Sequence, residues 1–137
     1  MSPRRLANLA AVTHLRESVA LVLAAAATIL GITMMADPAA YRAETFRLAT
    51  AWVAPQGWGV LHVGTGGLLT WSVVIDRRTA HLPATALGCM WAAWSALITL
   101  EVSDGDGVPS AAVIYAAVSW LAGLVAVGYW LTRHEET

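Results

Sequence analysis

The sequence predicts an all-α integral membrane protein, a four-helix bundle with a short interfacial amphipathic helix. Hydrophobic residues make up 58% of the 137-residue chain and charged residues 12%, whereas ordinary soluble domains are about 45–50% apolar and about 25% charged. Four stretches contain no Asp, Glu, Lys or Arg, and each is close to the ~20 residues that a helix needs to cross a bilayer. We therefore expect residues 1–137 to form a single membrane domain.

The four predicted spans are Ser18–Ala36, Trp58–Ile75, Leu82–Leu100 and Val108–Thr132. Since the backbone in lipid must satisfy its own hydrogen bonds, each span should be a helix. Pro83 and Pro109 fall in the first turns of the third and fourth spans, where proline is tolerated. Cleavage of the first span as a signal peptide would leave three spans, but its uncharged stretch exceeds the usual ~7–15 residues of a signal-peptide core.

Between the first two spans, residues 38–53 are interpreted as a short amphipathic helix. Asp37 followed by Pro38 is typical of a helix start. Three side chains share one face of this helix: Tyr41, Leu48 and Trp52. We expect the helix to lie on the outer surface of the membrane. A lid over the bundle is the alternative.

The distribution of arginine predicts the orientation of the chain. Six lie on one side of the predicted spans: Arg4, Arg5, Arg16, Arg77, Arg78 and Arg133. The other side carries Arg42 and Arg47 and an acidic turn of Glu101, Asp104 and Asp106. The excess of arginine favours a cytoplasmic position for both termini. The net charge of −1 offers no electrostatic basis for binding nucleic acid.

A row of small residues marks one face of the third span: Ala84, Gly88, Ala92 and Ala96. Close packing, rather than hydrophobicity, joins helices in lipid. We expect this row to be a contact face for helix packing or oligomerisation, and it could serve the chain's own bundle or a second copy. The run Gly64-Thr65-Gly66-Gly67 in the second span should also permit close helix approach.

A candidate intramembrane polar site comprises His62, Thr70, Trp91 and Trp94. His62 is an ionisable side chain well inside a span, on one helical row with Gly66 and Thr70. Such residues are often functional, although a neutral histidine can also hydrogen-bond across a helix pair. Trp91 and Trp94 share a face of the third span, with Trp120 at similar depth. These rings either pack in the core or line a ligand cavity.

Catalytic and cofactor motifs are not evident in the sequence. A single cysteine, Cys89, excludes an internal disulfide. We find no metal-ligand spacing, phosphate-binding loop or credible catalytic set. The sequence therefore predicts no metal, no cofactor and no enzymatic activity.

Several segments together resemble the short four-span membrane proteins of actinobacterial tailed phages and prophages. The resemblance runs over roughly residues 38–130. It includes Tyr41-Arg42 through Ala54-Pro55-Gln56-Gly57-Trp58-Gly59, the Arg77-Arg78 turn, the Trp-rich third span and the Gly107-Val108-Pro109 entry to the fourth.

Some of these phage proteins are holins. The resemblance implies a protein of the bacterial inner membrane that associates with further copies of itself. It also implies permeabilisation of the membrane for host lysis. The alternative is an accessory or small transport subunit that binds a ligand near His62, Trp91 and Trp94.

Overall fold

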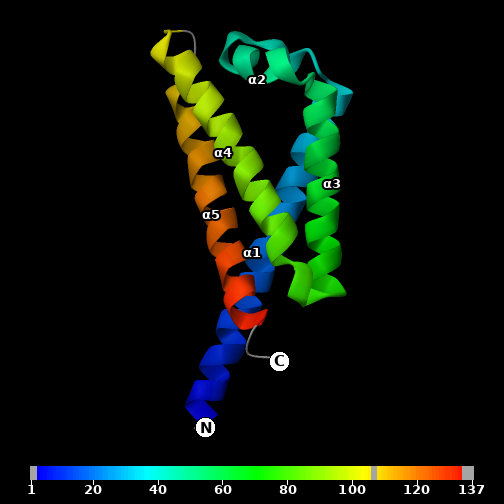
Figure 1. Ribbon diagram of the computed structural model, residues 1–137, viewed down its shortest axis with the longest axis vertical. Helices are drawn as coiled ribbons and strands as arrows, with labels where there is room; N and C mark the ends of the chain where they lie inside the picture. The colour runs from blue at the N-terminus through cyan, green and yellow to red at the C-terminus, as the bar shows by residue number, and fades with distance from the viewer. Residues whose placement is uncertain (1–2, 106–107, 134–137) are drawn as a thin grey trace.

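The computed structural model describes residues 3–105 and 108–133, and every secondary-structure element in these ranges is helical. The long helices are α1 (Pro3–Ala36), α3 (Pro55–Val74), α4 (His81–Ser103) and α5 (Pro109–Arg133). The short elements are η1 (Ala40–Arg42), η2 (Glu44–Phe46), α2 (Arg47–Trp52) and η3 (Arg77–Thr79). The long helices run alternately up and down (Figure 1). Asp106 and Gly107, which the sequence interpretation used, lie outside the described residues, as do the side chains of Arg4, Arg5 and Arg133.

Three helical segments in the described ranges are long and apolar enough to cross a membrane: Ala10–Ala36, Arg77–Ser103 and Pro109–Thr132. They correspond to the first, third and fourth predicted spans. The second predicted span coincides with α3, but five glycines, a glutamine and a histidine make this helix less apolar. Length and hydropathy therefore support three of the four predicted spans, and a fourth crossing by α3 stays a prediction.

Large hydrophobic side chains are exposed along all four long helices, including Val22, Ile29, Leu68, Val113 and Trp120. Water penalises such an apolar exterior, whereas lipid does not. The three apolar helices and this exterior are compatible with a membrane location.

The long helices form two pairs, α1 with α3 and α4 with α5, and contacts within each pair are more extensive than contacts between the pairs. Glycine brings the backbones of α1 and α3 together. A Cβ atom at Gly59 would lie 2.7 Å from the carbonyl oxygen of Gly31, and one at Gly66 would lie 2.7 Å from that of Ala24. The expected close approach is therefore found at Gly66, whereas Gly64 and Gly67 face open space.

The α4–α5 pair is joined by small residues and two hydroxyl groups. Ser119 Oγ donates to the carbonyl oxygen of Gly88, and Ser95 Oγ donates to that of Ala112, each at 2.9 Å. A Cβ atom at Gly88 would make ordinary contact with Ala122.

The predicted row of small residues on α4 is divided in the structure. Ala84 and Gly88 are buried, whereas Ala92 and Ala96 are exposed. Positions four apart drift by about 40° per step around a helix, so the row turns from the α4–α5 contact toward the outer surface, where Ala92 lines a groove between these two helices. Its first half serves the chain's own packing, and a role of the row in oligomerisation stays a prediction.

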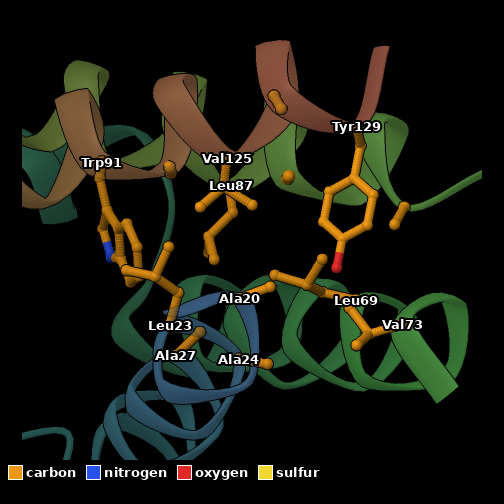
Figure 2. Close-up of a cluster of buried hydrophobic side chains, with 14 residues drawn as sticks. Ala20, Leu23, Ala24, Ala27, Leu69, Val73, Leu87, Trp91, Val125 and Tyr129 are labelled. Carbon is orange, nitrogen blue, oxygen red and sulfur yellow. The ribbon is translucent and has the colours of Figure 1, made fainter. Parts of the chain in front are cut away.

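Apolar side chains fill the space between the two pairs. Figure 2 shows Leu87, Trp91, Val125 and Tyr129 extending from α4 and α5 toward small and aliphatic residues of α1 and α3. These facing residues are Ala20, Leu23, Ala24, Ala27, Leu69 and Val73. The centre of the bundle is therefore held by apolar packing.

The single helix expected over residues 38–53 is wrong, because the structure has two 3₁₀ turns and the six-residue helix α2 there. Asp37 Oδ1 accepts the N–H of Ala40 at 3.3 Å, as expected at a helix start. Ala43 then adopts an extended conformation, with φ −58° and ψ 156°, which interrupts the helix. Residues 40–52, here called the lid, lie across the end of the bundle (Figure 1). Trp52 is exposed and does not share a packed face with Tyr41 and Leu48.

The glycine contact between α1 and α3 gives a first prediction. Gly59→Ala should lower the free energy of unfolding by about 1–3 kcal/mol, because its Cβ cannot fit against the backbone of Gly31 without moving the helices apart. Thermal unfolding in detergent micelles measures the effect. Gly64→Ala is the matched control on the same helix and should unfold at or above the wild-type temperature. Equal stability of Gly59→Ala and wild type would contradict the close approach.

Candidate functional site

His62 lies at the centre of a cluster of aromatic rings between α3 and α4. Its ring centroid is 6.5 Å from that of Trp58, 6.4 Å from that of Trp91 and 6.3 Å from that of Trp94. Trp91 and Trp94 are three residues apart and face α3 from one side of α4. The structure thus brings together three of the four residues of the predicted polar site. Thr70 is exposed and its hydroxyl donates to the Gly66 carbonyl oxygen at 3.0 Å, apart from this cluster.

The aromatic cluster continues from Trp94 toward the lid. The Trp94 ring lies 5.5 Å from Trp58, 5.4 Å from Phe46 of η2 and 5.5 Å from Tyr115 of α5. The cluster therefore links both helix pairs and the lid. Trp120, which was expected at similar depth, is 74% exposed on the outer surface of α5 and is not part of the cluster.

Two polar atoms in this cluster are buried and have no hydrogen-bond partner among the described residues: His62 Nε2 and Trp94 Nε1. His62 Nδ1 lies 2.8 Å from the carbonyl oxygen of Trp58, one turn earlier in α3. Nδ1–H is therefore the donor of that bond, and Nε2 is left as an acceptor. The hydrogen bond of His62 stays within its own helix and does not join a helix pair. Among the described residues, the cluster therefore contains one unmatched acceptor, His62 Nε2, and one unmatched donor, Trp94 Nε1. Leaving a buried polar group unpaired costs about 1–3 kcal/mol.

The lid is fastened to α4 by a carboxylate that is fully buried. Glu101 Oε1 accepts the N–H of Leu48 at 2.6 Å, and Oε2 lies 3.2 Å from Arg47 Nη2. Leu48 is in the first turn of α2, where a backbone N–H has no partner within the helix, so Glu101 caps α2 from another helix. Trp58 Nε1–H donates to the Ala49 carbonyl oxygen at 2.8 Å and fastens the lid to α3.

Sequence reasoning missed this role of Glu101, which was grouped with the acidic turn after the third span. Its partners lie 53 and 54 positions earlier in the chain, so no local pattern connects them. The available signal was a carboxylate directly after an uncharged run, at the same predicted side of the membrane as Arg47.

Polar contacts also join the helices at the opposite end of the bundle. Arg77 Nη1 lies 2.7 Å from Glu17 Oε1, which ties η3 to α1. Arg16 Nη1 donates to Thr132 Oγ1 at 2.8 Å, and its guanidinium lies 4.2 Å from the centroid of the Tyr129 ring. Both arginines were interpreted only as markers of orientation, yet they also fasten α1 to its neighbours. The orientation itself stays a prediction.

No protein-family model, no curated protein and no solved structure matches this chain.

The capping of α2 by Glu101 gives a second prediction. Glu101→Ala should lower the free energy of local lid opening by about 1–3 kcal/mol, because the N–H of Leu48 loses its acceptor. Amide hydrogen exchange of residues 46–50 in micelles measures this opening. Glu101→Gln retains one acceptor oxygen and should give a smaller effect.

Asp104→Asn is the matched control, because Asp104 is exposed one turn further along the chain. Amide hydrogen exchange of residues 46–50 in Asp104→Asn should equal that of the wild type. Unchanged exchange in Glu101→Ala would show that the aromatic contacts and the Trp58–Ala49 hydrogen bond hold the lid without Glu101.

Proposed function

We propose that the chain spans the bacterial inner membrane four times, with α3 crossing beside α1 and both termini in the cytoplasm. Three of the less apolar residues of α3 support this placement, because Gly59, His62 and Gly66 are buried inside the bundle, whereas Gln56, Gly64 and Gly67 are exposed. The side of α3 that faces outward carries large apolar residues: Val60, Leu61, Leu68 and Trp71. A helix that hides its polar face against a partner can cross lipid despite a modest mean hydropathy.

In this placement, the protein acts as a holin-like protein that associates with further copies and permeabilises the membrane for host lysis. The observation that carries the proposal is the division into two tight helix pairs. Within the α1–α3 pair, the two backbones approach closely. Within the α4–α5 pair, serine hydroxyls donate hydrogen bonds to backbone carbonyls of the other helix. Between the pairs, the contacts are apolar side chains and polar fastenings near the two ends. Separation of the pairs would therefore leave each pair intact and expose the same faces in every copy.

Rearrangement of the pairs would also change the surroundings of the buried polar groups. His62, Trp94 and Glu101 all lie in or beside the space between the pairs. Polar side chains are costly against lipid but are tolerated where they line water. An assembly of separated pairs can place these groups on a shared aqueous lumen, while the exposed Ala92 and Ala96 remain free to contact a neighbouring copy.

Permeabilisation is tested by inducible expression in a bacterium together with a cytoplasmic cell-wall hydrolase that has no signal sequence. We expect abrupt loss of membrane potential, followed by release of the hydrolase. Ala92→Leu should delay this loss, because a larger side chain obstructs close approach of a second copy. Ala93→Leu is the matched control at an adjacent exposed position outside the row and should keep wild-type timing.

A stable membrane potential, with the protein confirmed in the membrane fraction, would contradict the holin-like function. Equal timing of Ala92→Leu and wild type would remove the small-residue row from the mechanism.

A second candidate function is ligand binding by an accessory or small transport subunit. It is favoured by the unmatched acceptor at His62 Nε2 and the unmatched donor at Trp94 Nε1. A small molecule with a hydroxyl group could satisfy both, because a hydroxyl donates and accepts.

His62→Phe tests this second function, since phenylalanine keeps an aromatic ring and removes both nitrogen atoms. We expect the variant to reach wild-type levels in the membrane but to lose a small molecule that co-purifies with the wild type, as measured by mass spectrometry. If ligand binding is the function, expression of the wild-type protein should leave the membrane potential unchanged. Identical small-molecule content of the two proteins would exclude His62 as the anchor.

A further inference from the structure

The two ends of the bundle join the helix pairs in different ways. At one end, the chain itself passes from α3 through η3 into α4, so the pairs are connected covalently. Arg16 of α1 also reaches α5 there, where its Nη1 donates to the carbonyl oxygen of Gly128 at 2.9 Å. At the other end, α1 is connected to α3 and α4 to α5, so the chain turns back within each pair (Figure 1). Any attachment between the pairs at this second end is therefore non-covalent.

The lid lies at this second end and belongs to the α1–α3 pair. It connects these two helices in the sequence, and hydrogen bonds hold it to both of them. Trp58 Nε1–H of α3 donates to the Ala49 carbonyl oxygen at 2.8 Å. The hydroxyl groups of Tyr41 and Thr33, the latter on α1, are also 2.8 Å apart. These bonds lie within one pair, so separation of the pairs does not break them.

From this position, the lid reaches across to α4 of the other pair. Glu101 accepts the N–H of Leu48 at 2.6 Å and lies 3.2 Å from the guanidinium of Arg47. The Phe46 ring of the lid lies 5.4 Å from the Trp94 ring of α4. Because the Glu101 side chain is fully buried, water does not compete for its hydrogen bonds. The contact therefore joins the pairs at the end where the chain does not connect them.

We propose that the contact between the lid and α4 is an autoinhibitory clasp. While it is closed, the pairs stay together. Its release lets them swing apart at the lid end, about the covalent connection at η3, and so sets when the permeabilising assembly forms. Glu101 lies in the last turn of α4, so its carboxylate can be hydrated at the end of the bundle when the lid lifts. The inference concerns the regulation of the holin-like function and rests on that proposal.

The reactivity of a buried thiol measures how often the pairs separate in the purified full chain. Val125→Cys places the thiol on α5 and Cys89→Ser removes the native exposed one. Val125 is 5% exposed and extends toward α1 and α3 (Figure 2), so N-ethylmaleimide reacts with a thiol there when the pairs part. In micelles, Glu101→Ala should raise the labelling rate about tenfold, because the N–H of Leu48 loses its acceptor. Asp104→Asn should leave the rate unchanged.

A second variant breaks the same contact without altering a buried charge. Phe46→Ala removes the ring that packs against Trp94 and should also raise the labelling rate. Amide hydrogen exchange of residues 60–70 in α3 separates this effect from general unfolding, because the helices stay intact when the pairs part. An unchanged labelling rate in both variants would overturn the clasp. So would a labelling rate that rises only together with exchange in α3.

The regulatory role is tested in the bacterial expression assay described above. We expect Glu101→Ala to lose the membrane potential earlier than the wild type at equal levels in the membrane, and Asp104→Asn to match the wild type. Simultaneous loss in Glu101→Ala and wild type would overturn the regulatory role. A stable potential in both, with faster labelling of the purified variant, would instead contradict the permeabilising function and support the clasp as the contact that holds the pairs together.

Discussion

The approach of Gly31 to Gly59 determines how the rest of the bundle is placed. Helices surrounded by lipid gain little from burying apolar side chains against each other, so contact between backbones has to supply the attraction. Glycine permits that contact between α1 and α3. With α3 held at this distance, His62 and Trp58 face α4, and the aromatic cluster forms where the two helix pairs meet. Larger residues at these glycines would displace the cluster as well as the pair.

Polar contacts between the two pairs concentrate toward the ends of the bundle. Glu101 fastens the lid at one end, and Arg16 bonds across to α5 at the other. The described centre of the bundle is filled by apolar side chains, with the unpaired nitrogens of His62 and Trp94 toward the lid. Along its middle, the interface between the two helix pairs is therefore held by apolar packing with few hydrogen bonds or ion pairs. Such an interface favours the proposed separation of the pairs.

The sequence alone predicted the long helices well, because an uncharged run of spanning length has few other solutions in lipid. Pro83 and Pro109 lie near the starts of α4 and α5, as expected. Spacing along each helix also placed Trp91 and Trp94 on one face of α4, and the structure brings both rings close to His62 of α3. Spacing did not place Thr70, which lies apart from the cluster, and it could not tell which half of the small-residue row packs inside the bundle, because which face of a helix is covered depends on its neighbours. Glu101 was missed because its partners are distant in the chain. The lid was predicted as one helix, whereas Ala43 is extended and interrupts it.

The lid is bonded to one helix of each pair, to Trp58 of α3 through the carbonyl of Ala49 and to Glu101 of α4 through the N–H of Leu48. If the pairs separate, as proposed, the lid cannot keep both hydrogen bonds, so opening of the lid and separation of the pairs would be thermodynamically linked. By reciprocity, whatever favours one must favour the other by the same free energy. Separation of the pairs, as proposed above, therefore requires the lid to release at least one of these two hydrogen bonds, so the lid adds to the free energy that separation costs.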